Sequence, residues 1–263
     1  MDESPVSAGL LRGSNPAFQK KLEACLYDHH SRASSETDVF MPEPGRSATR
    51  GGASIETQDW SATHARYARF GKRAFDLAFA SLFMLLLGFW LLPLIGLLIK
   101  LDSRGPVFFR QFRLGANGVQ FRCFKFRTMT HDPRAGFVQA QKNDPRVTRV
   151  GRILRKTNLD ELPQFLNVLM GEMSVVGPRP HVPELDELFA ECVPGYSMRT
   201  SVLPGVTGLA QVSGCRGETR SIRKMTHRVR FDLFYARNMS LRMDIKIVFL
   251  TVWRALSGDE YAY

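Results

Sequence analysis

Two adjacent carboxylates, Asp160 and Glu161, are the residues of this chain best placed to do chemistry. They follow a run of basic residues and precede apolar residues at helical spacing. A carboxylate pair in such surroundings suits phosphoryl transfer, because one carboxylate can attack phosphorus while the other holds a divalent metal such as Mg²⁺. The simpler interpretation is that acidic residues in a first helical turn only stabilise that helix.

Basic residues surround the acidic pair along the sequence. Lys125 ends an expected strand, and Arg179 lies between two prolines that fix its backbone. Because a guanidinium group can donate to two phosphate oxygens at once, this density of arginine favours phosphate binding. A network of structural salt bridges is the alternative. The basic residues just before the pair are Arg146, Arg149, Arg152, Arg155 and Lys156.

A helix should position the two carboxylates in its first turn. Two capping boxes fit the sequence: Asn158 with Glu161 three residues on, or Thr157 with Asp160 three residues on. Gly171 is the expected end of this helix. The positive field of a helix N-terminus would favour the ionised forms of both carboxylates.

An apolar run over residues 77–99 contains no charged residue and is long enough to cross a bilayer, which takes roughly 20 residues. A buried core helix is the alternative. Pro93 should kink this helix. Because basic clusters flank the run on both sides, a spanning helix would place one of them outside, against the positive-inside rule. We therefore predict a re-entrant helix, with Asp76 near the interface and paired with Lys72 or Arg73.

The sequence divides into three predicted parts. Residues 1–66 are polar and too poor in aliphatic residues to fold, so we expect a disordered extension. Residues 67–104 form the re-entrant membrane helix, and residues 105–263 form a compact cytoplasmic domain. The expected fold class is α+β, mostly helical, with short strands and amphipathic helices at the membrane interface. The predicted strands span 105–111 and 119–126, and the predicted helices span 184–192, 219–237 and 240–256.

The composition indicates anionic partners and a reducing compartment. The net charge is +11 and the isoelectric point about 9.9, which favours phosphates, nucleotides, nucleic acid or an acidic membrane surface. The basic helix over 219–237 either lies on anionic headgroups or is simply solvated. The four cysteines are far apart and form no zinc spacing, so we interpret them as reduced thiols. The long apolar segment begins too far along the chain for a signal peptide.

Ordered motifs from Phe70 to Tyr263 make the chain resemble the bacterial sugar transferases, which are monotopic polyprenyl-phosphate phosphoglycosyl transferases. The motifs are, in order, Lys72–Asp76, Gly105–Gln111, Lys125–Met129, Asp144–Thr148, Leu159–Gln164, Val176–Pro180 and Pro204–Gly208. This resemblance implies a helix that is re-entrant, with both ends in the cytoplasm, at the bacterial inner membrane.

The resemblance also implies a covalent mechanism. Asp160 is expected to attack the β-phosphate of a UDP-sugar, so that UMP leaves and polyprenyl phosphate then takes up the phosphosugar. The same carboxylate and Glu161 are expected to hold Mg²⁺, the cofactor. Arg155 and Arg179 are expected to bind phosphates, with Lys125 as a further candidate for that role.

The chain departs from the family pattern in two ways. Leu92-Pro93 stands where many members have Ser-Pro, and a polar tail stands in place of several N-terminal spans, as in the short form. The segment 214–235 is similar to members that transfer glucose 1-phosphate at the start of exopolysaccharide synthesis, which favours glucose. The partners expected are UDP-sugar, polyprenyl phosphate and membrane lipid, without nucleic acid; a homodimer remains open.

One other class of function fits the basic charge. A membrane-anchored binding protein could recruit nucleic acid or acidic lipid without catalysis. That interpretation gives Asp160 and Glu161 no role, and it predicts that no UMP is released.

Overall fold

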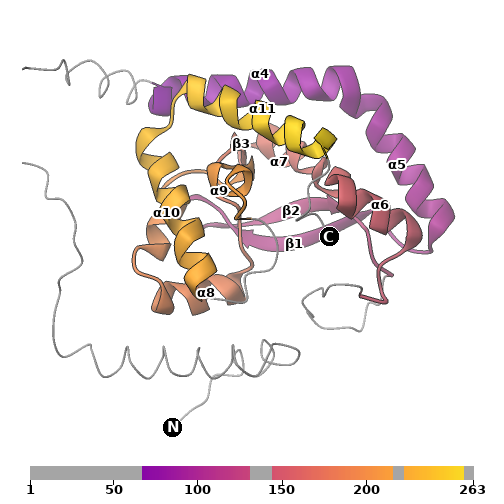
Figure 1. The fold of residues 1–263 in the computed structure, drawn as a ribbon. Coiled ribbons are helices and arrows are strands. Elements are labelled where there is room, and N and C mark those ends of the chain that lie inside the picture. The colour runs from indigo at the N-terminus through magenta and orange to yellow at the C-terminus, as the bar shows by residue number, and fades with distance from the viewer. Residues whose placement is uncertain (1–66, 131–143, 216–221, 258–263) are drawn as a thin grey trace, which may run out of the picture.

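The computed structural model describes residues 67–130, 144–215 and 222–257. Within these ranges helices predominate, and the two small sheets have two strands each, as Figure 1 shows. The predicted α+β class with a mostly helical content is thus confirmed. The expected disorder of 1–66 lies outside the described residues.

The N-terminal part of the described chain is one continuous apolar helix, Tyr67–Asp102, with a mean hydropathy of 2.6 in its most apolar window. A π-helical turn, Tyr67–Gly71, leads into α4 (Lys72–Phe83), and a second one, Met84–Gly88, leads into α5 (Phe89–Asp102). By length and composition this helix can cross a membrane, and only 28% of that window is buried in the protein.

The long helix bends between α4 and α5, as Figure 1 shows. Pro93 lies in the second turn of α5, just after the π-helical turn Met84–Gly88. A proline removes one backbone hydrogen bond and its ring crowds the carbonyl four residues earlier, so the helix deforms on the N-terminal side of the proline. The predicted bend is confirmed. The re-entrant path through a membrane stays a prediction.

Asp76 attaches this helix to the rest of the fold. Its side chain is fully buried in the protein, and its place near the membrane interface stays a prediction. Its carboxylate pairs with Lys72 at 2.9 Å, as predicted, and also accepts hydrogen bonds from the Ser174 hydroxyl and the Val175 amide at 3.0 Å each. Arg73 instead donates to backbone carbonyls at the end of a neighbouring helix. A buried carboxylate needs such partners, and here they attach the apolar helix to the rest of the fold.

A β-hairpin follows the apolar helix. Its strands β1 (Phe108–Leu114) and β2 (Gln120–Phe126) are antiparallel and in register from Phe108 opposite Phe126 to Leu114 opposite Gln120. The turn contains Asn117 and Gly118, both at positive φ, which these two residue types tolerate. Both predicted strands are thereby confirmed.

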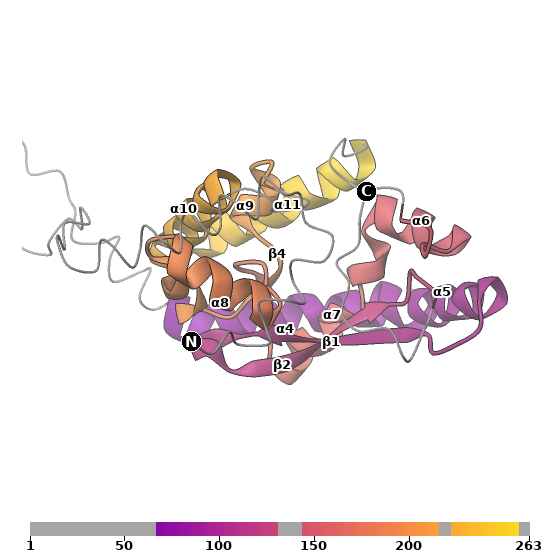
Figure 2. The same cartoon turned by 90° about the horizontal axis from the view of Figure 1, so that it is seen from below.

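The helices that follow pack against the hairpin, against α4 and against one another. A short parallel sheet joins β3 (Ser174–Val176) to β4 (Gly205–Thr207). Figures 1 and 2 show α8 and α10 near one end of the hairpin, and α6 near the other. The three helices predicted after residue 183 are confirmed within the described residues. The helices are α6 (Arg149–Thr157), α7 (Gln164–Met170), α8 (Pro183–Cys192), α9 (Leu209–Val212), α10 (Ile222–Asn238) and α11 (Leu241–Ser257).

The main core lies between α4 and the hairpin. Phe165 of α7 stacks on Phe83 at 4.1 Å and on Phe79 at 6.2 Å between ring centroids. Val168 and Met173 are fully buried in the same cluster. Because α7 directly follows the acidic pair, this packing fixes the pair relative to the apolar helix.

Candidate active site

The acidic pair lies in a tight turn between two helices. Asp160 and Glu161 belong to a 3₁₀ turn, Leu159–Glu161, that joins α6 to α7. Asn158 adopts a left-handed conformation with φ 57° and ends α6, and its side chain makes no capping hydrogen bond. Both predicted capping boxes are therefore wrong, because a left-handed asparagine typically stops a helix. The predicted end at Gly171 is confirmed, with φ 87°.

Glu161 is held by two cations. Its carboxylate accepts from Lys125 at 2.6 Å, and from Arg179 through both terminal nitrogens at 2.9 and 2.5 Å. Burial opposes ionisation, but Arg179 and Lys125 together hold the pKa of Glu161 well below its ordinary value. Glu161 is therefore ionised in this structure, and both of its carboxylate oxygens are held by cations.

Asp160 differs from Glu161 both in its partners and in its pKa. Within the described residues, no hydrogen bond or ion pair holds its carboxylate. Burial raises the pKa of Asp160 to about 6; the charge of Glu161 adds to this effect, and Lys125, Arg155 and Arg179 oppose it. The expected helix-end stabilisation of its anion is therefore outweighed by burial. A carboxylate of raised pKa without a protein partner is a better nucleophile than a clamped one.

Of the basic residues in the run just before the pair, Arg155 is the one whose charge lowers the pKa of Asp160. Its Nε donates to the Thr128 hydroxyl at 2.8 Å, and burial lowers the pKa of the guanidinium while Asp160 opposes the shift. Arg146 pairs instead with Asp144 at 2.6 Å. The other three basic residues of the run are exposed: Arg149, Arg152 and Lys156. The structure thus brings Lys125, Arg155 and Arg179 around the pair, and leaves the rest of the run outside.

Two residues that support the site were not found from the sequence. The hydroxyl of Thr128 orients Arg155, and its carbonyl accepts from the Thr148 amide at 3.1 Å. Arg127 donates to the carbonyls of Arg104 and Ser103, at 2.5 and 2.7 Å, which ties the end of α5 to the hairpin. Both residues stand in the motif that contains Lys125, where only the lysine was considered for chemistry.

The site fits a divalent cation that arrives with a phosphate ligand. Among the described residues, no cluster of three or more His, Cys, Asp and Glu side chains forms a complete metal site. Mg²⁺ needs only one or two carboxylates when substrate phosphates supply further oxygens. The unpartnered Asp160 carboxylate beside Glu161 is consistent with this kind of coordination.

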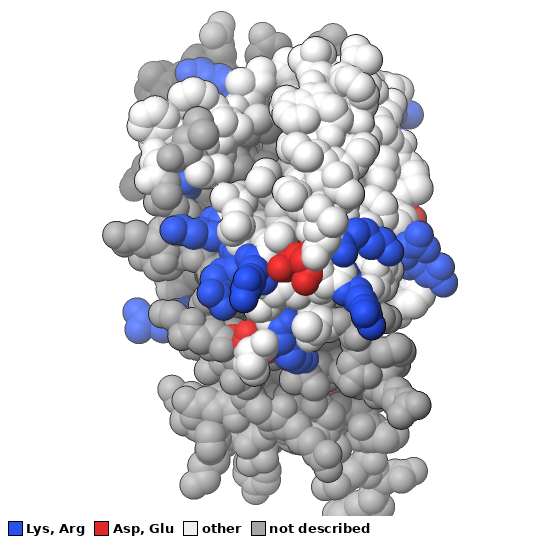
Figure 3. Space-filling view, turned by 90° about the vertical axis from the view of Figure 1, so that its right-hand side faces the viewer, with Lys and Arg blue, Asp and Glu red and all other residues white. Residues whose placement is uncertain are grey.

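Charged and uncharged side chains occupy separate areas of the surface. Figure 3 shows lysine and arginine side chains around acidic ones, below a broad surface without charged side chains. That surface lies on the side of the molecule that carries α4 and α11 in Figure 1, and both helices expose large apolar side chains, such as Leu82 of α4 and Phe249 of α11. An apolar face bordered by cations is the arrangement expected of a protein that sits on an anionic membrane.

Comparison with known proteins identifies the family. The model of the bacterial sugar transferase family matches residues 67–258. The chain belongs to this family. The match covers every described residue, so the site built from α6, α7 and the hairpin lies wholly inside the matched region.

Curated relatives in the family differ in length. The UDP-glucose:undecaprenyl-phosphate glucose-1-phosphate transferase of Escherichia coli K12 is 52% identical over 184 residues, which are 70% of this chain and 39% of that protein. The chain therefore aligns with about two fifths of that longer relative. The exopolysaccharide production protein PSS of Rhizobium leguminosarum bv. phaseoli is 50% identical over 194 residues, which are 72% of this chain and 96% of that protein. A UDP-N-acetylgalactosamine-using relative from Aeromonas hydrophila is 43% identical over 162 residues, which are 61% of this chain and 38% of that protein.

Proposed function

We propose that this protein transfers a sugar 1-phosphate, preferably glucose 1-phosphate, from a UDP-sugar to undecaprenyl phosphate and releases UMP. The observation that carries the proposal is the asymmetry of the acidic pair. Among the described residues Asp160 has no hydrogen-bond or ion-pair partner, and its pKa is about 6, while two cations clamp Glu161 beside it. The relatives named as UDP-glucose:undecaprenyl-phosphate transferases support the substrates, and one named for UDP-N-acetylgalactosamine shows that the sugar varies within the family.

The proposed reaction has two displacement steps at phosphorus. An oxygen of Asp160 forms a bond to the β-phosphorus, and the bond from that phosphorus to the bridging oxygen breaks. UMP leaves with the bonding electron pair. An oxygen of undecaprenyl phosphate then attacks the same phosphorus and displaces the carboxylate, which restores Asp160. Each step exchanges one P–O bond for another, so no external oxidant or reductant is needed.

In this proposal the cations of the site bind Glu161 first and the substrate phosphates afterwards. Lys125 and Arg179 can only donate, and before substrate binds they donate to Glu161. Arriving phosphates compete for these donors, and Arg155, which no described carboxylate pairs with, adds a third cation. Glu161 and Asp160 are the residues that would hold Mg²⁺, which would supply positive charge against the phosphate oxygens.

The apolar face is proposed to place this site at the cytoplasmic surface of the inner membrane. Large apolar side chains at the bend are exposed, with 71% for Leu85 and 69% for Phe89. On α11, Ile245, Phe249 and Trp253 are spaced by four residues and are 54%, 65% and 60% exposed. Because the bend allows both basic ends of the apolar helix to stay on one side, we propose the re-entrant path, with the site at the level of the lipid headgroups.

The direct test is UMP release by the purified full chain with undecaprenyl phosphate, Mg²⁺ and a panel of UDP-sugars. UMP should appear with UDP-glucose in greatest yield. If no UDP-sugar gives UMP, the proposal fails, and the membrane-anchored binding protein without catalysis becomes the better account. If another sugar is strongly preferred, only the choice of glucose is wrong.

A further inference from the structure

The segment that carries Arg179 is anchored almost entirely through its carbonyl oxygens. Pro178 and Pro180 flank Arg179 and have no N–H to donate. Three different elements supply the donors to these carbonyls instead. The three hydrogen bonds run from the Gly205 amide to Pro178 at 2.9 Å, from Arg199 to Arg179 at 2.6 Å, and from Arg113 to Pro180 at 3.2 Å.

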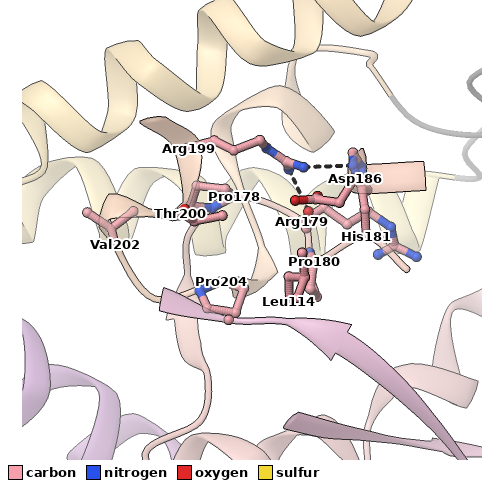
Figure 4. A pocket seen from close by; sticks show the side chains of 11 residues that line it. Leu114, Pro178, Arg179, Pro180, His181, Asp186, Arg199, Thr200, Val202 and Pro204 are labelled. Carbon is pink, nitrogen blue, oxygen red and sulfur yellow. Dashed lines mark hydrogen bonds between the residues drawn. The ribbon is translucent and has the colours of Figure 1, made fainter. Parts of the chain in front are cut away.

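Arg199 is the residue whose donor reaches Arg179 itself. It lies in the 3₁₀ segment Tyr196–Ser201, and only 3% of it is exposed. Figure 4 shows its guanidinium between the Arg179 carbonyl and the imidazole of His181, whose Nδ1 lies 2.7 Å from NH1. The same NH2 that donates to Arg179 lies 2.9 Å from Asp232 of α10. The guanidinium is thus held from three directions.

His181 acts in this cluster as a neutral acceptor. Burial, followed by the charges of Arg199 and Arg228, holds the pKa of His181 well below its ordinary value. Arg199 NH1 lies 2.7 Å from Nδ1 and Arg228 NH1 lies 3.2 Å from Nε2. Since a guanidinium group can only donate, the ring nitrogen without a hydrogen accepts from the arginine that faces it. Asp232 is 2% exposed and neutralises Arg199 on the other side. A buried arginine with satisfied donors and a buried counter-ion is rigid.

We propose that Arg199 is a positioning residue for Arg179, and hence for the phosphate-binding end of the site. Arg199 fixes the Arg179 backbone by a charge-assisted hydrogen bond and thereby sets where the Arg179 guanidinium meets Glu161 and the nucleotide phosphates. The inference rests on the proposed function for the phosphate ligand. The inference goes beyond that function because Arg199 acts on the backbone of Arg179.

Arg199→Lys tests this role because it keeps the charge beside Asp232 but removes the planar group. A single ammonium cannot reach the Arg179 carbonyl, His181 and Asp232 together. We expect the KM for the UDP-sugar to rise about ten-fold, which is what losing one hydrogen bond to a charged group costs. A defect that only lowers the amount of folded protein would reduce the apparent kcat and leave KM unchanged.

Phe189→Leu is the matched control for stability. Phe189 of α8 is fully buried and stacks on Tyr196 at 6.1 Å. Its truncation therefore weakens the lobe formed by α8, the 3₁₀ segment that contains Tyr196 and α10, while every polar side chain of the cluster is kept. This variant should lower Tm at least as much as Arg199→Lys and leave KM as in the wild type. If Phe189→Leu raises KM equally, the effect belongs to lobe stability and the inference is wrong.

A double-mutant cycle isolates the pathway through Arg179. In an Arg179→Gln background, Arg199→Lys should raise KM no further, because the group that it positions is already gone. Additive effects on KM would contradict the inference.

Hydrogen–deuterium exchange of peptides covering residues 174–182 gives a readout that needs no activity. Arg199→Lys should speed exchange there, while Phe189→Leu should affect this segment no more than the rest of its lobe. If the wild type releases no UMP, the proposed function fails, whereas unchanged exchange in Arg199→Lys overturns the positioning role by itself.

Discussion

At the residue scale, the two carboxylates of the pair have opposite electrostatic surroundings. Glu161 is fixed by Lys125 and Arg179, whereas Asp160 has no described partner and a pKa of about 6. Two acidic residues in adjacent positions are thereby given separate tasks, because burial and cations act on them unequally. In our account Asp160 forms the covalent bond, and Glu161 serves charge and metal binding.

Glu161→Gln tests the second task. The amide keeps the shape but loses the charge that pairs with Lys125 and Arg179 and that binds metal. Turnover should fall at least about a hundred-fold, and the Mg²⁺ concentration for half-maximal rate should rise. A titration of UMP release with Mg²⁺ measures both. A variant with the wild-type Mg²⁺ dependence would show that Glu161 is not a metal ligand.

Thr128→Val tests the support of Arg155 with a nearly isosteric change. Losing the acceptor at 2.8 Å frees the Arg155 side chain, so the KM for the UDP-sugar should rise about three- to ten-fold, with kcat less affected. Thr226→Val on α10 is the matched control, because the Thr226 hydroxyl only bonds back to the Ile222 carbonyl in its own helix. Equal KM values for the two variants would remove Thr128 from the site.

At the element scale, the sequence predicts correctly those helices and strands that a periodic pattern of side chains defines. The hairpin and the helices after residue 183 follow from side-chain periodicity, so their places were predicted correctly. The turn that carries Asp160 was assigned to an α-helix because a left-handed Asn158 leaves no mark in that periodicity. A capping box is a short pattern, and here two overlapping ones fitted equally well.

The contacts between distant elements could not be predicted in the same way. Asp76 is buried because Ser174 and Val175 come to it from nearly 100 residues away. Arg199 reaches Arg179 and His181 only once the 3₁₀ segment, α8 and α10 are packed together. The family resemblance therefore named Lys125, Arg155 and Arg179, but the residues that support them became visible only in the fold.

The bend of the apolar helix is the element most open to a direct test. Pro93→Ala restores a backbone hydrogen bond and should straighten the helix, which favours a full span and lowers UMP release without altering the site. With the four native cysteines replaced by serine, single cysteines placed by Arg69→Cys and Arg104→Cys, both at exposed flanks, report the topology by labelling in intact cells and inverted vesicles. In the wild-type helix both should react from the cytoplasmic side. A flank that reacts only from the outside would rule out the re-entrant path.

At the scale of the whole molecule, chemistry and membrane attachment are arranged on one body. The apolar face combines the exposed side chains at the bend of the long helix with those on α11. Figure 3 shows lysine and arginine side chains below a broad uncharged surface. The buried group formed by Asp76, Lys72 and Asp244 joins α4 to α11, with Lys72 at 2.9 and 2.8 Å from the two carboxylates. These two helices are thereby held in one fixed relation to the site.

Phe249→Ser tests the contribution of α11 to membrane attachment. Its phenyl ring is 65% exposed, and burying it in lipid is worth about 1.5–3 kcal/mol. The affinity for anionic vesicles should fall about ten-fold in co-sedimentation, with Tm unchanged. Phe112→Ser, a change of a similarly exposed phenylalanine (50%) on the hairpin, is the control and should bind like the wild type. Identical losses would mean that α11 has no special role.

The central claim, covalent transfer through Asp160, is tested most directly by mass spectrometry of the purified protein after incubation with UDP-glucose and Mg²⁺ without lipid acceptor. We predict a mass increase of one phosphoglucose group that maps to the peptide containing Asp160, that is lost on addition of undecaprenyl phosphate, and that is absent in a folded Asp160→Asn variant. UMP release that requires the lipid acceptor, with no adduct in the wild type, would contradict the account and indicate direct transfer between the two substrates.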